Sequence, residues 1–190
     1  MNTHLIIGLG NPGTEYETTR HNAGRLAVRA FQKTAKLPDF SENKKFASLL
    51  SEGKIGKTKI ILALPETMMN NSGKAVGALA AFYKIKPADI IVTHDDSDIV
   101  FGAMKISFAK RAAGHRGVES VRRALKTDQF WRARIGIQPS TKKHIPAMNL
   151  VLKKFSAKDL LALKKITKTA TKALELFITE GGERAMNKCN

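Results

Sequence analysis

The stretch LIIGLGNPGTEYETTRHNAG, residues 5–24, constrains the fold of this chain more than any other. It opens with the apolar run Leu5 to Leu9, which favours a buried β-strand. The glycines and the proline of residues 8–13 then predict a tight loop at the carboxyl end of that strand. Because open α/β sheets bind ligands at such strand ends, we expect the functional site here.

Polar side chains follow this loop, where the chain enters its first predicted helix. Asn11, Arg20, His21 and Asn22 can all form hydrogen bonds, and a histidine can exchange a proton near neutral pH. Asn22 is predicted to be the N-cap of a helix with an apolar stripe over residues 26–31. His21 would then stand at the start of that helix, beside the glycine loop.

The rest of the chain alternates predicted strands with predicted helices. The expected elements are strands at 45–54 and 57–64 joined by a turn near Gly56, a helix after Asn70–Ser72, strands at 90–92 and 103–108, a helix at 118–126, a strand at 132–137, a basic loop at 142–146 and a helix at 156–179. This order predicts the α/β class, as a single-domain three-layer sandwich with a twisted mixed β-sheet flanked by helices.

The length of 190 residues favours one domain over residues 1–190. The long helix at 156–179 has a broad apolar face that includes Leu160 and Leu161, so we expect it to pack on the core. Gly181 and Gly182 are expected to end it and to leave residues 180–190 as a loose tail.

Positive charge is concentrated in the second half of the chain. The net charge is +17, and residues 101–190 hold 20 Lys and Arg against 6 Asp and Glu. Such a field attracts a polyanion, most often nucleic acid, although a solubility role or an anionic membrane surface would also account for it. We expect no membrane association, because no basic amphipathic helix carries the aromatic residues of a membrane binder. The single cysteine, Cys189, fits a reducing, cytoplasmic compartment.

The sequence patterns that could indicate a cofactor or a metal site lack the neighbouring residues that such sites need. Residues 8–13 match G-x-G-x-x-G, but the helix starts too late and residues 28–38 lack the acidic residue of a dinucleotide site. An EF-hand that starts at Asp96 would place Phe101 and Ser107 where glycine and glutamate are needed. The histidines lack helical zinc-ligand spacing, and no G-x-S-x-G elbow is present. We therefore expect no cofactor and no metal.

The remaining polar residues suit hydrolysis by an activated water molecule. His21 can accept the proton of water while a carboxylate such as Asp95 holds its other ring nitrogen. Asn11 and Asn70 offer carboxamides for the water, the carbonyl or the oxyanion. A purely structural role, as helix-capping residues, stays open on the residues alone.

The chain resembles the family of bacterial-type peptidyl-tRNA hydrolases. The segment GLGNPGTEYETTRHNAG is similar to the signature of that family, and PETMMNNSGKAV, HDDSDIVFG, GHRG and FWRARIGI follow in the family's order and approximate spacing. The likeness covers nearly the whole chain and is weakest in the tail. It implies hydrolysis of the ester between a peptide and the 3′ end of tRNA, by a monomer that needs neither metal nor cofactor.

The resemblance also implies roles for individual residues. His21 would be the catalytic base and Asp95 its partner, while Asn11 falls where the family distinguishes blocked from free aminoacyl-tRNA. The residues that match the substrate cleft and the basic positions that grip tRNA are Tyr16, Met68, Asn70, Lys105 and Arg134. Arg116 falls in the same cleft.

Three departures from the family pattern affect the grip on the substrate. Arg116 stands where the family has an asparagine that contacts the peptide, and arginine donates hydrogen bonds but cannot accept them. Ala112 and Ala113 stiffen a bend that the family makes with glycines, and Met68 replaces a frequent aromatic residue. Two alternatives therefore accompany the hydrolase: an RNA-binding protein with reduced or lost hydrolase activity, and a hydrolase of another adenosine-linked ester.

Overall fold

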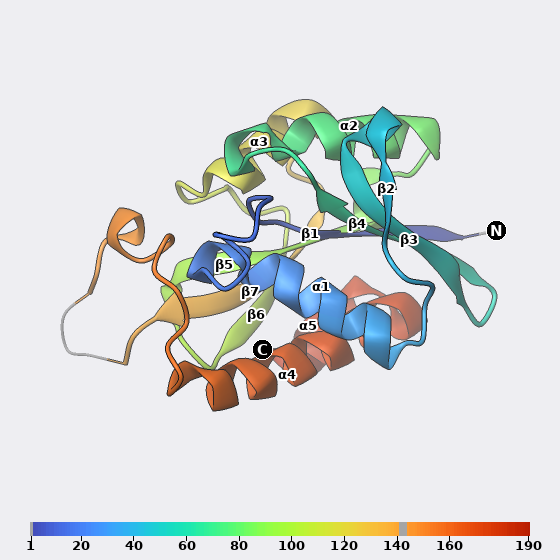
Figure 1. Cartoon of the computed structure of the whole chain (residues 1–190). Helices are drawn as coiled ribbons and strands as arrows, with labels where there is room; N and C mark the ends of the chain where they lie inside the picture. Colours follow the sequence, from blue (N-terminus) through green and yellow to red (C-terminus); the bar gives the residue numbers. More distant parts are fainter. Residues whose placement is uncertain (1, 141–143) are drawn as a thin grey trace.

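The computed structural model describes residues 2–140 and 144–190, and it contains a seven-stranded mixed sheet with the strand order β2-β3-β4-β1-β5-β7-β6 (Figure 1). The strands are β1 (Thr3–Gly8), β2 (Ser41–Asn43), β3 (Ser48–Ile55), β4 (Thr58–Pro65), β5 (Ile90–Val100), β6 (Met104–Phe108) and β7 (Trp131–Gln138). The four central strands are parallel, whereas β2, β3 and β6 run antiparallel to their neighbours. The predicted mixed sheet is therefore confirmed.

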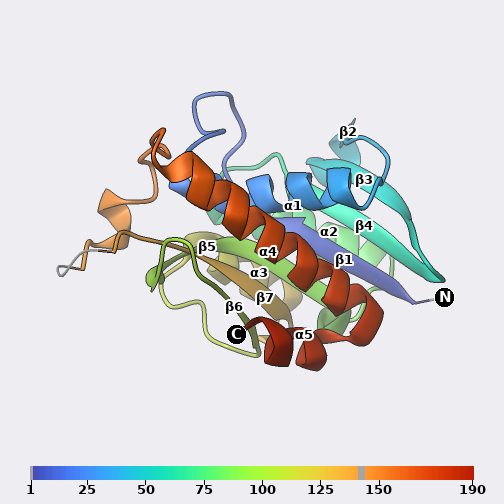
Figure 2. The same ribbon diagram turned by 90° about the horizontal axis from the view of Figure 1, so that it is seen from below.

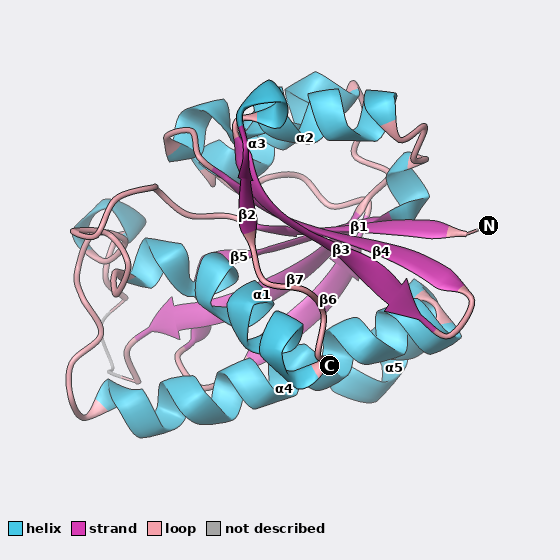
Figure 3. Cartoon of the chain, turned by 45° about the vertical axis from the view of Figure 1, so that its right-hand side comes forward, coloured by secondary structure: helices cyan, strands magenta, loops and turns pink. Residues whose placement is uncertain are grey.

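Helices cover both faces of this sheet, as predicted for a three-layer sandwich. The helices are α1 (Ala23–Thr34), α2 (Ser72–Phe82), α3 (Arg116–Leu125), α4 (Asp159–Glu180) and α5 (Gly182–Cys189). One face carries α2 and α3, and the other carries α1, α4 and α5 (Figures 1 and 3). Viewed from below, α4 lies beside α1 and crosses that second face (Figure 2).

The central strands are apolar on both faces because each face has its own core. In β1, Leu5 and Ile7 pack with α2 and α3, while Ile6 packs with α1 and α4. Strands that are buried on both faces have nearly continuous apolar sequences, as in residues 5–9 and 90–92. No helix within residues 2–140 and 144–190 is both long enough and apolar enough to cross a bilayer.

The structure confirms the hairpin but corrects the long helix. Strands β3 and β4 pair with a turn at Gly56, where the prediction placed it. The long helix, α4, begins at Asp159 instead of residue 156, and its apolar face is narrower than expected, because Leu160 and Leu161 are 56% and 82% exposed. The later part of α4, around Phe177, packs in the core. Residues 142 and 143 of the predicted basic loop lie outside the described residues.

The expected loose tail is instead a helix, α5, that packs against the sheet. Gly182 lies against the ring of Trp131, where an added Cβ would be 2.1 Å from the indole, and Ala185 is fully buried. The Asn190 side chain accepts a hydrogen bond from the Ile106 backbone nitrogen at 2.6 Å and donates one to the Ile106 carbonyl at 2.9 Å. These contacts order the segment although few of its residues are apolar.

Candidate active site

A cavity of about 550 Å³ lies beside the segment that follows β1 and the second half of β5. Its lining residues are Asn11, Tyr16, His21, Met68, Met69, Asn70, Asp95, Asp96, Ser97, Asp98, Ala112, Ala113, Gly114, His115, Arg116, Ala147, Met148, Val151 and Leu152. Seven of the nine predicted site residues are in this set, and Lys105 and Arg134 are not. The volume is typical of a site for a small ligand or the end of a larger one.

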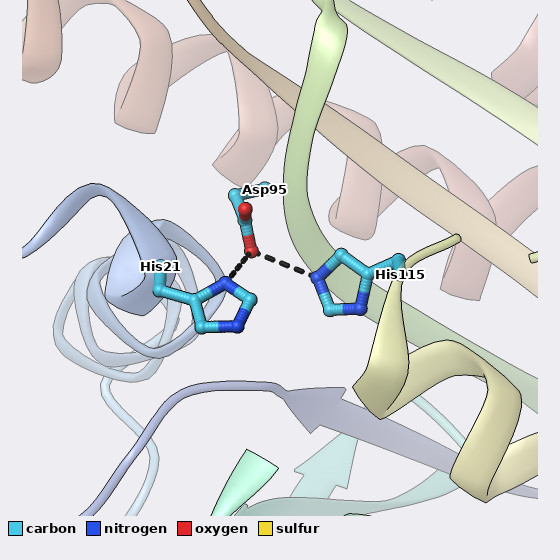
Figure 4. A group of neighbouring side chains, drawn as sticks. All are labelled: His21, Asp95 and His115. Carbon is cyan, nitrogen blue, oxygen red and sulfur yellow. Dashed lines mark hydrogen bonds and ion pairs between the residues drawn. The ribbon is translucent and has the colours of Figure 1, made fainter. Parts of the chain in front are cut away.

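His21 and Asp95 meet in this cavity, as the sequence predicts. His21 lies in the 3₁₀ helix η1 (Arg20–Asn22), and its Nδ1 is 2.8 Å from Asp95 Oδ1 (Figure 4). The pair is close because α1 packs directly on β5: a Cβ on Gly24 would lie 2.1 Å from the Thr93 carbonyl oxygen. Only glycine allows this approach of helix and strand.

His115 is the residue that the sequence analysis missed at this site. Its Nε2 is also 2.8 Å from Asp95 Oδ1, so the carboxylate oxygen lies between two imidazoles (Figure 4). His115 is at the same time the N-cap of α3, since its Nδ1 accepts hydrogen bonds from the backbone nitrogens of Gly117 and Val118. Histidine is not among the usual N-cap residues, so the pattern gave little signal for this role.

The helix cap determines where the protons of this group lie. Because His115 Nδ1 accepts hydrogen bonds, its ring proton is on Nε2 and is donated to Asp95. Asp95 is ionised, so it also accepts a hydrogen bond from His21, whose ring proton is therefore on Nδ1. The Nε2 atom of His21 therefore keeps its lone pair and can act as a base.

Burial and neighbouring histidines shift the pKa of Asp95 in opposite directions. Burial raises the pKa of Asp95, but its charge interactions and hydrogen bonds with His115 and His21 lower it more, and the resulting pKa lies well below its usual range. Burial, His115 and Arg132 lower the pKa of His94 well below its ordinary value. His94 is thus neutral at neutral pH and packs its ring edge against His115, with the ring centroids 4.7 Å apart.

The cluster of His21, Asp95 and His115 has the donor set of a metal site, which the spacing argument in the sequence did not foresee. One ligand atom from each residue lies within 4.8 Å of the others. A neutral histidine that binds a metal through Nε2 carries its proton on Nδ1, and in His115 that nitrogen already accepts two backbone hydrogen bonds. The cap therefore fits a hydrogen-bonding role for His115 better than a role as a metal ligand.

Asn11 is held so that its amide group faces this cavity. Its side-chain oxygen accepts a hydrogen bond from the Met69 backbone nitrogen at 2.8 Å, and its NH2 group makes no hydrogen bond to any of residues 2–140 and 144–190. The predicted side-chain cap by Asn22 is wrong, because the Asn22 carboxamide instead bonds to the Asn11 backbone nitrogen and oxygen, each at 2.9 Å. Asn22 thus fixes the loop that presents Asn11.

The other predicted residues divide between the cavity and the sheet. Tyr16, Met68, Asn70 and Arg116 line the cavity. The segment 147–152 adds Met148 and Leu152, which the sequence analysis did not identify and which are 81% and 59% exposed. These two side chains give the wall an apolar surface.

Lys105 and Arg134 lie opposite each other on β6 and β7, outside the cavity lining. Arg134 Nε is 2.8 Å from Asp96 Oδ2, and Asp96 belongs to the cavity wall. Lys105 is exposed and makes no ion pair within residues 2–140 and 144–190. The two basic residues therefore stand next to the site, and only Lys105 is without an acidic partner in that part of the chain.

Comparisons with known proteins agree on one family. The sequence model of the family described as peptidyl-tRNA hydrolase matches residues 5–190. The chain is 41% identical to a peptidyl-tRNA hydrolase of Desulfitobacterium hafniense over 98% of both chains, and 38% identical to one of Aquifex aeolicus over all of this chain and 97% of the relative. The crystal structure of peptidyl-tRNA hydrolase from Acinetobacter baumannii superposes with a TM-score of 0.89 and 32% identity, covering all of this chain and 95% of that one. The chain belongs to the peptidyl-tRNA hydrolase family.

Proposed function

We propose that this protein hydrolyses the ester between the peptide and the tRNA of peptidyl-tRNA, with water as the nucleophile and His21 as the general base. The observation that carries this proposal is the contact of His21 Nδ1 with Asp95 Oδ1 at 2.8 Å in a cavity of about 550 Å³. It leaves His21 Nε2 available to a water molecule. A base positioned in this way contributes roughly 10²–10⁴ to a rate.

The reaction follows from the protons of this group. His21 Nε2 takes a proton from water as the water oxygen attacks the ester carbonyl, and Asp95 stabilises the imidazolium that forms. The NH2 group of Asn11 donates to the carbonyl oxygen as it gains charge. The tetrahedral intermediate then breaks its bond to the tRNA 3′ oxygen, which receives the proton from His21. The products are a free tRNA hydroxyl and a peptide carboxylic acid, which loses its proton to the solvent.

His115 acts as a positioning residue for this step. Its hydrogen bond from Nε2 fixes the same Asp95 oxygen that orients His21, and its Nδ1 anchors it to the first turn of α3. Asp95 therefore has two fixed donors, so its carboxylate cannot turn away from His21 without losing both bonds. The backbone of α3 thereby supports a catalytic group on β5.

The apolar part of the cavity suits the peptide, and the basic surface beside it suits the tRNA. Met68, Met148 and Leu152 are exposed apolar side chains that can pack against peptide residues of different shapes. Lys105 and Arg134 would contact tRNA phosphates, in agreement with the excess of positive charge after residue 100. Asn70 would help to place the peptide and the water, and Tyr16 lies on the same wall.

We also propose that the protein acts as a cytoplasmic monomer. The residues of the His21 group all come from one chain, so the reaction needs no second copy. A single cysteine, Cys189, suits a reducing compartment.

The alternative of an RNA-binding protein without hydrolase activity is not favoured. It depends on Arg116 and the 110–116 loop, but His21 Nδ1 and Asp95 Oδ1 are in contact at 2.8 Å, and Arg116 has no hydrogen bond or ion pair to either residue within residues 2–140 and 144–190. A single-turnover assay with excess enzyme and an N-acetylated aminoacyl-tRNA tests both possibilities. We expect wild type to release the acylated amino acid. The hydrolase proposal fails if release appears only in Arg116→Asn, or in neither protein. A nucleotide-linked ester hydrolysed faster than the tRNA-linked one would favour the third possibility.

Salt dependence tests the proposed tRNA surface. Replacing Lys105 with glutamine is expected to lower the slope of log affinity against log salt concentration by about 1, because one phosphate contact is lost. The catalytic rate at saturation is expected to stay unchanged. Lys54→Gln, at an exposed lysine of the β3 hairpin, is the matched control. Equal slopes for the two variants would remove Lys105 from the interface.

A further inference from the structure

Arg116 differs from the other charged residues of the catalytic cavity in having no partner. The three acidic residues of the wall each have a basic neighbour: Asp95 has His21 and His115, Asp96 has Arg134, and Asp98 has His144 at 3.7 Å. Within residues 2–140 and 144–190, the Arg116 guanidinium makes neither an ion pair nor a hydrogen bond. Arg116, whose side chain is exposed, is therefore the charged residue of the cavity wall that has no partner in the described part of the chain.

The backbone that carries Arg116 is held firmly on both sides. His115 is bonded to Asp95, and its ring centroid lies 5.1 Å from that of His21. Gly117 is packed so tightly that an added Cβ would lie 2.3 Å from Met69 Sδ. The guanidinium therefore extends from a fixed point, one residue away from the catalytic group.

Backbone nitrogens at the start of α3 are already occupied by hydrogen bonds to the cap residue. The backbone nitrogens of Gly117 and Val118 donate to His115 Nδ1, and that of Glu119 donates to the His115 carbonyl oxygen. The nitrogens of Gly117 and Val118 are among the groups that would otherwise bind an anion at a helix N-terminus. Recognition here falls to the Arg116 side chain, whose planar fork of donors matches a carboxylate or a phosphate.

We propose that Arg116 is a receptor for an anionic group of the substrate, an inference that rests on the proposed hydrolysis and specifies its substrate. The anion has two possible sources: a carboxylate side chain of the peptide, or the phosphodiester of the tRNA 3′-terminal nucleotide. Both suit a guanidinium that is part of the wall but has no acidic neighbour. An asparagine at this position would instead suit the neutral amides of a peptide.

The peptide source is tested with two isosteric substrates on one tRNA. N-acetylated dipeptides that carry glutamate or glutamine are esterified to the same tRNA, with the test residue at the ester position in one series and next to it in another. If the peptide supplies the anion, wild-type kcat/KM is expected to be about tenfold higher for glutamate in one series, and the ratio falls to about 1 in Arg116→Asn. Arg116→Lys, which keeps the charge but loses the fork, is expected to give an intermediate ratio.

The phosphate source is tested with minimal substrates. The same neutral peptide is esterified to adenosine, which has no phosphate, and to cytidylyl-adenosine, which has one. If the phosphodiester is the anion, the phosphate raises wild-type kcat/KM about tenfold and raises that of Arg116→Asn much less. The glutamate to glutamine ratio then stays near 1 in both proteins.

The matched control is Arg111→Asn, which removes the same charge from an exposed arginine outside the cavity lining. It is expected to keep both wild-type ratios. The proposal is supported if Arg116→Asn changes either the glutamate-to-glutamine ratio or the effect of the phosphate on kcat/KM. It is overturned if neither of these two quantities changes in that variant. If wild type hydrolyses these esters but the two ratios do not depend on Arg116, the proposed function stands and only the proposal for Arg116 fails. If wild type hydrolyses none of these esters, both proposals fail.

Discussion

Replacing His21 with alanine is expected to slow peptide release from peptidyl-tRNA by roughly 10²–10⁴-fold, with little change in tRNA affinity. The variant removes the nitrogen that the proposed reaction uses as its base, while the Lys105 and Arg134 surface is untouched. Single-turnover release under excess enzyme measures the chemical step, and tRNA binding is measured separately at the same salt concentration.

His144→Ala is the matched control for this variant, because His144 is an exposed histidine outside the cavity lining. It is expected to release peptide at the wild-type rate. If His21→Ala also kept that rate, water activation by His21 would be excluded, even if the fold and the tRNA affinity were unchanged.

Asp95→Asn is expected to slow release by roughly 10³–10⁴-fold, as when the carboxylate that orients a catalytic imidazole becomes an amide. The amide has almost the same shape as the carboxylate, but it cannot balance the charge of the His21 imidazolium. Its NH2 group also allows the wrong His21 tautomer, in which Nε2 carries the proton and cannot accept one. Single-turnover release is again the measurement.

The effect of Asp95→Asn on stability is expected to depend on pH. The pKa of Asp95 lies below its ordinary value of 3.8, so its charged form stabilises the fold above about pH 4. That contribution is lost as the pH falls from there toward the lowered pKa of the folded state. The difference in free energy of unfolding between wild type and variant should therefore be larger at about pH 6 than at about pH 3.

Asp89→Asn is the control variant for both measurements, the rate of peptide release and the free energy of unfolding. Asp89 lies just before the start of β5, where its Oδ1 is 3.8 Å from His4 Nδ1. This variant also changes a carboxylate beside a histidine, but it is expected to keep the wild-type rate of release. If Asp95→Asn matched it in rate, Asp95 would have no part in orienting His21.

The sequence predicted the features of the fold that depend on local pattern. The continuous apolar runs of β1 and β5 and the turn at Gly56 were sufficient to predict a mixed sheet between helices. His21 and Asp95 were predicted to pair because a basic imidazole needs a carboxylate at its other ring nitrogen and because both residues match the family's motifs. The 2.8 Å contact between His21 Nδ1 and Asp95 Oδ1 confirms this pairing. Their catalytic roles stay predictions.

The features that the sequence did not predict depend on contacts between distant residues. Asn22 resembles a helix cap, but its side chain bonds to a backbone eleven residues earlier. His115 has no local pattern that marks it as a partner of Asp95, twenty residues away. Residues 182–189 have few apolar side chains, so their order depends on contacts with distant residues, such as that of Gly182 with Trp131.

The carboxamide of Asn190 has a consequence for how copies of this protein behave in a crowded solution. Strand β6 is at the rim of the sheet, and a rim strand with unpaired backbone groups is a template for intermolecular β-pairing. Asn190 occupies both the nitrogen and the oxygen of Ile106, midway along that rim. These two backbone groups are therefore not open to pairing with a strand of a second molecule, which makes the middle of β6 a poor template for such pairing.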